Sequence, residues 1–381
     1  MKFSIKTKAA ILWSLSVISG SAALTGLGIL SFTGNPDAFF RFLKTYQLIR
    51  QEYFREVDEE TLWIGAERGM VAALGDPYSQ LLTDDTYDSF MEQTNSEYGG
   101  IGVVIGNGMD GYFYILSVFP GSTAEKAGLL PGDRLDSIDG RTTADMDLTQ
   151  AAGAIRGEAG TTVSLSVQRE GERRTFPISR SAVSLPTVRS LMVTPDIGYI
   201  HIYSFGAHTA EEFKKEYEKL SEAGIKGLIL DLRMNPGGLL DSAVAVADQL
   251  LSGGPIVSYR QKDGTLQEFS IQGTDRRIPL AVLIDRNSAS AAEILAGAVQ
   301  DKKEGILIGE KSFGKGTVQI VHPMTGEEAL KLSVAQYFTA AGRQIDRIGI
   351  TPDIAVSQEG LVFDPESDTV ILRAVQELMK K

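Results

Sequence analysis

Two residues in the second half of this sequence have side chains that could carry out covalent catalysis. Ser290 and Lys315 lie 25 residues apart in the stretch 285–319, and the lysine stands between two glycines. A neutral lysine can take the proton of a serine hydroxyl, which then attacks a carbonyl carbon. This role requires burial to lower the pKa of Lys315 from its usual value of about 10.4. The pair therefore indicates acyl-transfer chemistry.

The same residues also fit a purely structural role. Ser290 and Glu293 form the pattern Ser-x-x-Glu, the capping box found at the start of many helices that have no catalytic function. A lysine between glycines can equally lie on an exposed turn. The residues alone leave both interpretations open.

The predicted elements around Ser290 would hold it in a suitable place for catalysis. Residues 278–286 form a short apolar strand, and residues 289–301 carry Ala, Ile and Leu at helical spacing without a proline. Ser290 therefore lies at a strand-to-helix junction. Its hydroxyl would stand beside unpaired N–H groups and the positive end of the helix dipole, which favour the negative charge of an attacked carbonyl.

These motifs resemble those of the C-terminal processing (tail-specific) serine peptidases. The resemblance lies in SASAAEILAGAVQD, followed at the family's interval by FGKGTVQ. It implies that Ser290 is the nucleophile, Lys315 the general base and Gln319 the third catalytic residue. Lys315 and Gln319 are an even number of residues apart, so on an extended segment their side chains share a face. Asp301 also matches a family position, and we expect it to be a structural residue at the helix end.

A glycine-containing phrase, NPGG at residues 235–238, lies between a predicted strand and a predicted helix. Glycines at such a junction can direct backbone N–H groups at an anion. The phrase resembles the family's oxyanion loop. The resemblance implies that Gly237 or Gly238 donates one hydrogen bond to the oxyanion, and that the N–H of Ala291 donates the other. Asn235 could equally be a simple turn residue.

Residues 98–181 consist of short predicted strands and glycine turns, and residues 120–140 closely resemble part of a PDZ domain. In that family a glycine-rich loop presents backbone N–H groups to the terminal carboxylate of a peptide, which adds to the sheet as a strand. The resemblance assigns this loop to Gly100, Ile101, Gly102 and Val103. Arg156 matches a position that couples the PDZ domain to the protease in the family, but it could equally be a solvated arginine at a helix end.

Composition limits the partners and cofactors. The 381 residues carry 37 basic and 49 acidic side chains, a net charge of −12, which argues against a nucleic-acid partner. The absence of cysteine excludes disulfides, thiolate metal sites and cysteine nucleophiles. No metal or nucleotide motif is present, so we expect no metal and no cofactor. A Ser-His-Asp hydrolase is the rival enzyme, but none of the three histidines lies in a glycine-framed motif: His201, His208 and His322.

The N-terminal segment predicts export. Residues 9–32 form 24 uncharged, largely apolar positions behind three lysines, enough helix to cross a bilayer core of about 30 Å. We expect an uncleaved membrane anchor, with the rest of the chain on the extracytoplasmic side of the cell envelope. A cleaved signal peptide is the alternative, because residues 21–23 are small. Resemblance to the family also suggests a homodimer formed through the helical region that follows.

Together these patterns predict a multidomain α/β protein. We expect a signal anchor or signal peptide (1–34), a helical region (35–96), a PDZ domain (97–182), an α/β Ser-Lys protease core of crotonase- or Clp-protease-like architecture (183–355) and a C-terminal helical tail (356–381). The predicted function is a serine endopeptidase that cleaves proteins or peptides near C-termini recognised by its PDZ domain. The alternative is a catalytically inert, membrane-tethered PDZ scaffold.

Overall fold

The computed structural model describes most of the chain. The described residues are 34–83, 86–87, 90, 97–108, 110–119, 121–184, 186–275, 278–324, 328–357 and 365–380. Among them, no helix is both long enough and apolar enough to cross a membrane. The predicted anchor, residues 9–32, lies outside the described residues. The chain divides into two units, the first ending at Leu81 and the second beginning at Leu82, and each is described by itself.

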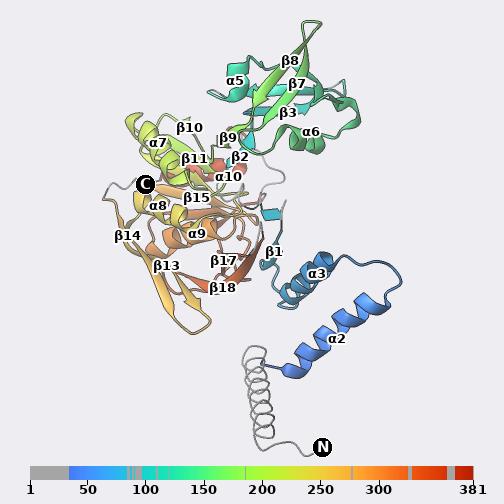
Figure 1. Ribbon diagram of the computed structural model, residues 1–381. Coiled ribbons are helices and arrows are strands. Elements are labelled where there is room, and N and C mark those ends of the chain that lie inside the picture. The colour runs from blue at the N-terminus through green and yellow to red at the C-terminus, as the bar shows by residue number, and fades with distance from the viewer. Residues whose placement is uncertain are drawn as a thin grey trace, which may run out of the picture. The chain divides into compact units, whose positions relative to one another are not determined.

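The first unit contains helices where the sequence predicts them. They are α2 (Pro36–Glu52) and α3 (Glu59–Ala72), followed by the short strand β1 (Gln80–Leu82) (Figure 1). Each helix starts at a side-chain cap, Asn35 for α2 and Asp58 for α3. Neither helix contains a buried residue.

The PDZ-like part of the second unit is a sheet with the strand order β3-β4-β5-β7-β8. Its strands are β3 (Val103–Asn107), β4 (Phe113–Val118), β5 (Arg134–Ile138), β7 (Thr162–Arg169) and β8 (Glu172–Ser179). Two helices accompany them, α5 (Thr123–Ala127) and α6 (Leu148–Ile155), and β2 (Glu97–Gly100) pairs with β9 (Ser181–Ser184). Because β3 ends the strand order, one of its edges is not paired with any described strand.

The remaining part of the second unit contains a sheet with the order β10-β11-β12-β15-β16-β19. Its strands are β10 (Val188–Thr194), β11 (Ile197–Ile202), β12 (Gly227–Asp231), β15 (Leu280–Ile284), β16 (Ile306–Gly309) and β19 (Ile354–Ala355). β10 runs antiparallel to β11, and the other neighbouring pairs are parallel. This arrangement is the predicted α/β core.

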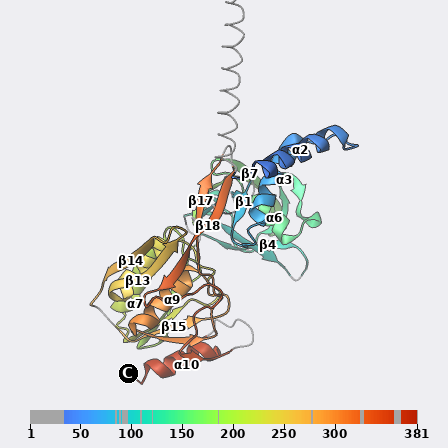
Figure 2. The same ribbon diagram turned by 90° about the horizontal axis from the view of Figure 1, so that it is seen from below.

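Helices cover both faces of this sheet. α7 (Thr209–Glu222), α8 (Leu240–Leu250) and α9 (Ala291–Lys302) pack on one face, and α10 (Thr369–Leu378) packs on the other (Figure 2). Strand side chains alternate between the faces, so Leu228 and Leu230 join the first cluster while Ile229 joins the α10 cluster. Both faces are buried, which explains the nearly continuous apolar runs of these strands.

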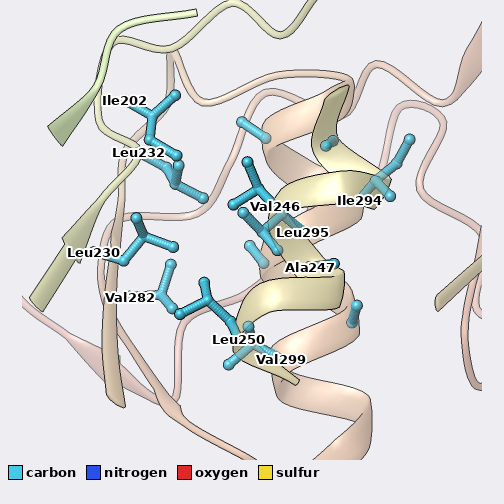
Figure 3. Packing of buried hydrophobic residues seen from close by; sticks show 14 of the residues in the cluster. Ile202, Leu230, Leu232, Val246, Ala247, Leu250, Val282, Ile294, Leu295 and Val299 are labelled. Atoms are coloured by element: carbon cyan, nitrogen blue, oxygen red, sulfur yellow. The ribbon is translucent and has the colours of Figure 1, made fainter. Parts of the chain in front are cut away.

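The larger cluster fixes α8 and α9 against the sheet. Figure 3 shows Ile202, Leu230 and Val282 of the strands facing Val246 and Leu295 of the helices, and all five are fully buried. Burial of each large side chain contributes about 1.5–3 kcal/mol. The junctions that follow β12 and β15 are therefore held by rigid elements.

A second, antiparallel sheet contains β13 (Ser252–Gln261), β14 (Leu266–Gly273), β17 (Thr317–Pro323) and β18 (Ala329–Thr339). β18 lies between β17 and β13, and β14 pairs with the other edge of β13. The pairing of β17 with β18 shifts register between Val318 and Gln319. This sheet carries the segment that follows Lys315.

Candidate active site

Ser290 occupies a strained turn between β15 and α9. Its backbone has φ 55° and ψ −115°, a conformation that costs a residue with a side chain of the order of 1–3 kcal/mol. The turn puts Ser290 at the N-cap of α9, where the first N–H groups have no intrahelical acceptor. Within the described residues, Ala291 N–H donates no hydrogen bond. The predicted junction is therefore present, with a free N–H beside the serine.

Ser288 and Ser290 have different surroundings. Ser288 is fully buried, and its hydroxyl donates to the carbonyl of Leu232 at 2.7 Å and accepts the N–H of Asp285 at 2.9 Å. These bonds tie the end of β15 to the end of β12. Ser290 is only partly buried. The geometry gives Ser288 a structural role and leaves Ser290 as the more exposed of the two serines.

The glycine loop packs directly against the Ser290 turn. A Cβ on Gly237, whose φ is 100°, would lie 2.8 Å from Ser290 Cβ and 3.0 Å from Ala291 N, so only glycine fits. Gly237 N–H donates to Asn235 Oδ1 at 2.8 Å. Gly238 N–H donates no hydrogen bond within the described part of the chain. Of the two glycines predicted as oxyanion donors, Gly238 is the one whose N–H is available.

Asn235 is more than a simple turn residue. It is fully buried, and its side-chain Nδ2 donates to the carbonyl of Ile202 at 2.8 Å. Its backbone carbonyl accepts the N–H of Ala289 at 2.9 Å. Together with the bond from Gly237, these contacts hold the glycine loop to β11 and to the residue before Ser290. Asn235 therefore fixes the loop relative to the candidate nucleophile.

Glu293 joins the Ser290 turn to the lysine loop. Its carboxylate is fully buried and accepts four hydrogen bonds. Oε2 accepts the N–H groups of Ser290 and Lys315, both at 2.8 Å. Oε1 accepts the hydroxyl of Ser312 at 2.6 Å and the N–H of Gly314 at 2.7 Å. Burial raises the pKa of Glu293, while the four hydrogen bonds oppose this increase.

The role of Glu293 extends beyond the predicted capping box. The bond from Ser290 N–H belongs to that box, but three further bonds come from a loop about twenty residues away in the sequence. The structure thereby brings Ser290 and Lys315 together, since their N–H groups share one oxygen. The Ser-x-x-Glu pattern gave no signal for this second function.

Lys315 and Gln319 do not lie on one regular extended segment. Lys315 is half-buried in the loop before β17, whereas Gln319 lies within β17. The register shift at Gln319 places the additional residue, Val334, in β18, so it leaves the alternation along β17 intact. Gln319 Nε2 donates to the carbonyl of Thr317 at 3.0 Å and to the hydroxyl of Ser333 at 3.2 Å. A catalytic role for Gln319 stays a prediction.

Two other predicted residues have structural contacts. Asp301, near the end of α9, accepts the N–H of Ala341 at 2.7 Å and pairs with Arg343 at 2.5 Å. His201 is buried, its Nε2 lies 3.2 Å from the carbonyl oxygen of Arg233, and burial lowers its pKa. These contacts suit the expected structural role of Asp301 and give His201 a place in the core.

A groove of about 530 Å³ lies in the PDZ-like part, between β3 and α6. Its apolar lining comes from Ile101, Val103, Ile105, Leu148, Ala152 and Ile155. Gly102 and Arg156 also line it, whereas Gly100 belongs to β2 and pairs with Ser181. Within the described residues, the N–H groups of Ile101 and Gly102 donate no hydrogen bond. Three of the four predicted loop residues and Arg156 therefore face one groove.

Comparison with known proteins shows the family. The model of peptidase family S41 matches residues 196–356, the PDZ domain model matches residues 114–169, and the model of the activating protease CtpB N-terminal domain matches residues 31–86. The carboxy-terminal processing protease CtpB of Bacillus subtilis is 38% identical over 322 residues, covering 83% of this chain and 67% of that protein. The chain belongs to peptidase family S41. It is a serine-type peptidase that contains a PDZ domain.

Further proteins similar to this S41 peptidase are also named C-terminal processing proteases. The carboxyl-terminal-processing protease of Synechocystis is 33% identical over 372 residues, covering 88% of this chain and 87% of that protein. Among solved structures, a photosystem II D1 C-terminal processing protease has 30% sequence identity and a TM-score of 0.54, covering 90% of this chain and 92% of the other. These similarities confirm the predicted multidomain α/β fold and favour a protease over an inert scaffold.

Proposed function

We propose that this S41 peptidase is an extracytoplasmic endopeptidase in which Ser290 is the nucleophile and Lys315 the general base. The observation that supports this pairing best is the Glu293 carboxylate, one oxygen of which accepts the N–H groups of both residues. A buried acceptor with four donors orders the helix start and the lysine loop as one piece. Such pre-organisation is what proton transfer between the two side chains requires.

The reaction begins when Ser290 Oγ attacks the carbonyl carbon of the scissile peptide bond. The serine proton passes to the neutral Nζ of Lys315, and the carbonyl oxygen becomes an oxyanion. The N–H groups of Gly238 and Ala291, which have no described acceptor, would donate to that oxyanion. Lys315 then returns the proton to the leaving amine. Water repeats the sequence on the acyl-enzyme, and Gln319 would orient Lys315 through its amide oxygen.

The groove between β3 and α6 would capture the C-terminus of the substrate. A peptide added along the unpaired edge of β3 would direct alternate side chains toward α6. The groove wall facing those side chains is apolar, so we propose that the bound terminus carries apolar residues at the last and third-last positions. The terminal carboxylate would accept the N–H groups of Ile101 and Gly102.

The proposed location rests on the first residues of the chain. Residues 9–32 are uncharged and follow three lysines, a pattern that places the basic end inside and the remaining chain outside the cell membrane. The absence of cysteine is compatible with such an envelope location. A homodimer formed through α2 and α3 remains part of the proposal. Fractionation of cells that produce the full chain, followed by protease accessibility from the outside, tests the location.

Substitution of the two serines and the lysine tests the catalytic assignment. Ser290→Ala and Lys315→Ala should each abolish cleavage of unfolded casein while the thermal unfolding temperature stays close to wild type. Ser288→Ala should keep substantial activity per folded molecule. Its cost is a lost buried hydrogen bond, about 1–3 kcal/mol of stability. Cleavage by Ser290→Ala at the wild-type rate would show that both the nucleophile and the mechanism are wrong.

A further inference from the structure

Three charged side chains form a buried cluster at the carboxyl end of β12. The side chain of Arg233 is 6% exposed, and those of Asp231 and Asp368 are 0% exposed. Arg233 Nη2 lies 2.6 Å from Asp231 Oδ2, and its Nη1 lies 2.9 Å from Asp368 Oδ2. Asp368 stands 135 residues further along the chain. The cluster therefore joins the central sheet to the C-terminal helix.

Asp368 has two separate roles in this cluster. It is the N-cap of α10, where Oδ1 accepts the N–H groups of Val370 and Ile371 at 2.9 and 3.0 Å. It is also the second carboxylate beside Arg233. Capping needs only a neutral acceptor such as Asn or Ser. Since buried ion pairs gain little stability over apolar packing, a second buried carboxylate is not explained by stability alone.

The backbone that follows Arg233 leads directly into the glycine loop. The carbonyl oxygen of Arg233 lies 3.2 Å from His201 Nε2, and Arg233 N–H donates to Asp231 Oδ1 at 2.9 Å. Met234, with φ 59°, donates its N–H to Asp285 Oδ1 at 3.0 Å. Asn235 comes next and holds both the glycine loop and the residue before Ser290. Only Met234 therefore separates Arg233 from the residue that holds the loop.

We propose that Asp368 is a positioning residue: by fixing the Arg233 guanidinium from the side of α10, it holds the glycine loop in register with Ser290. The inference rests on the proposed role of Ser290 and of the glycine loop. It makes α10 part of the machinery that orders the oxyanion site. Asp368 itself would touch neither substrate nor the reacting atoms.

The variant Asp368→Asn tests the proposal because Asn keeps the cap and removes the charge that faces Arg233. We expect kcat on labelled casein to fall at least about tenfold, as displaced catalytic groups do, with KM changed less than about twofold. The rate at which a fluorophosphonate labels Ser290 should fall in parallel, because that reaction also uses the oxyanion donors. Asp368→Glu, which restores the charge, should recover part of kcat.

Leu378→Ala is the matched control. Leu378 is a buried residue at the other end of α10, so its truncation weakens the packing of the helix without touching Arg233. Measured below its unfolding temperature, it should keep wild-type kcat. A wild-type kcat in Asp368→Asn, or an equal loss in Leu378→Ala, would overturn the proposal. So would failure of both Asp368→Asn and Asp368→Ser to fold, since the role would then be structural.

The labelling experiment separates this inference from the proposed function. If Ser290→Ala retains labelling and cleavage, the nucleophile is wrong and the proposed function fails. If Ser290→Ala loses both while Asp368→Asn matches wild type, the proposed function stands and only the role of Asp368 fails.

Discussion

The carboxylate oxygen Oε2 of Glu293 accepts the backbone N–H of Lys315 at 2.8 Å. The same oxygen accepts the N–H of Ser290 at the same distance, so one buried atom ties together the two residues proposed to share a proton. These two hydrogen bonds fix the backbone of Ser290 relative to the backbone of Lys315. Glu293 is for this reason the residue through which the proposed catalytic pair can be tested without altering either member.

Glu293→Gln should lower kcat strongly and leave KM nearly unchanged. Each carboxylate oxygen accepts two donors, but a glutamine has only one oxygen, and its NH₂ group would face two donors. Leaving buried donors unpaired costs about 1–3 kcal/mol each. Steady-state kinetics on labelled casein, at a temperature where the variant is folded, checks this. An unchanged kcat would remove Glu293 from the site.

The stability cost of Glu293→Gln should be larger in acid than at neutral pH. Burial raises the folded-state pKa of Glu293 above its ordinary value of 4.5, so the contribution of this group to stability is full below 4.5. That contribution is lost as pH rises through the raised pKa, whereas glutamine does not titrate. Urea unfolding of both proteins across this range measures the difference. A difference that grows with pH would mean that the pKa of Glu293 is lowered instead.

Gly237→Ala should abolish activity, while Gly264→Ala should not. Both glycines have positive φ, 100° and 87°, so alanine strains either backbone by about 1–2 kcal/mol. Only at Gly237 would the new Cβ meet the Ser290 turn, at 2.8 Å, because nothing lies within 4 Å at Gly264. Thermal unfolding of the two variants measures the cost of backbone strain, and casein cleavage shows whether the new Cβ at Gly237 obstructs the Ser290 turn. Equal activities would show that the glycine loop does not border the reacting atoms.

Activity should rise with pH above neutrality. A lysine that serves as base must first lose its proton, so kcat/KM should climb where a histidine base, with a usual pKa of about 6.5, would already be neutral. The pH profile of kcat/KM on one peptide substrate measures this directly. A profile that is flat above pH 7 would indicate a histidine base, and substitution of His208 and His322 would be the next step.

Amidation of the substrate's C-terminus should slow cleavage severalfold or more. Each N–H of the PDZ loop that donates to a carboxylate contributes about 1.5–3 kcal/mol, which a neutral carboxamide cannot match. Paired free-acid and amide peptides with apolar ends give the comparison. Arg156→Ala should weaken the dependence if Arg156, which lines the groove, couples the two domains. Equal rates for acid and amide would show that the groove does not recognise the terminus.

The sequence by itself determined the local features of this protein. The apolar runs of β12 and β15, the helical spacing of α9 and the glycine signals of the NPGG and FGKG phrases each depend on neighbouring residues, and the structure places these elements as expected. The motifs SASAAEILAGAVQD and FGKGTVQ also identified the family, because their order and the interval between them can be read from the sequence. Even the choice of Ser290 over Ser288 came from the motif.

Only the tertiary structure decided which groups meet. Glu293 accepts donors from a loop about twenty residues away, and Asp368 reaches Arg233 across 135 residues. Neither contact has a periodicity that could reveal it, because both depend on how separate elements pack. The start of β17 at Thr317 likewise depends on pairing with β18, and it leaves Lys315 in the preceding loop, outside the strand that carries Gln319. The motifs thus supplied the residues proposed to react, while burial and packing supplied the contacts that hold them in place.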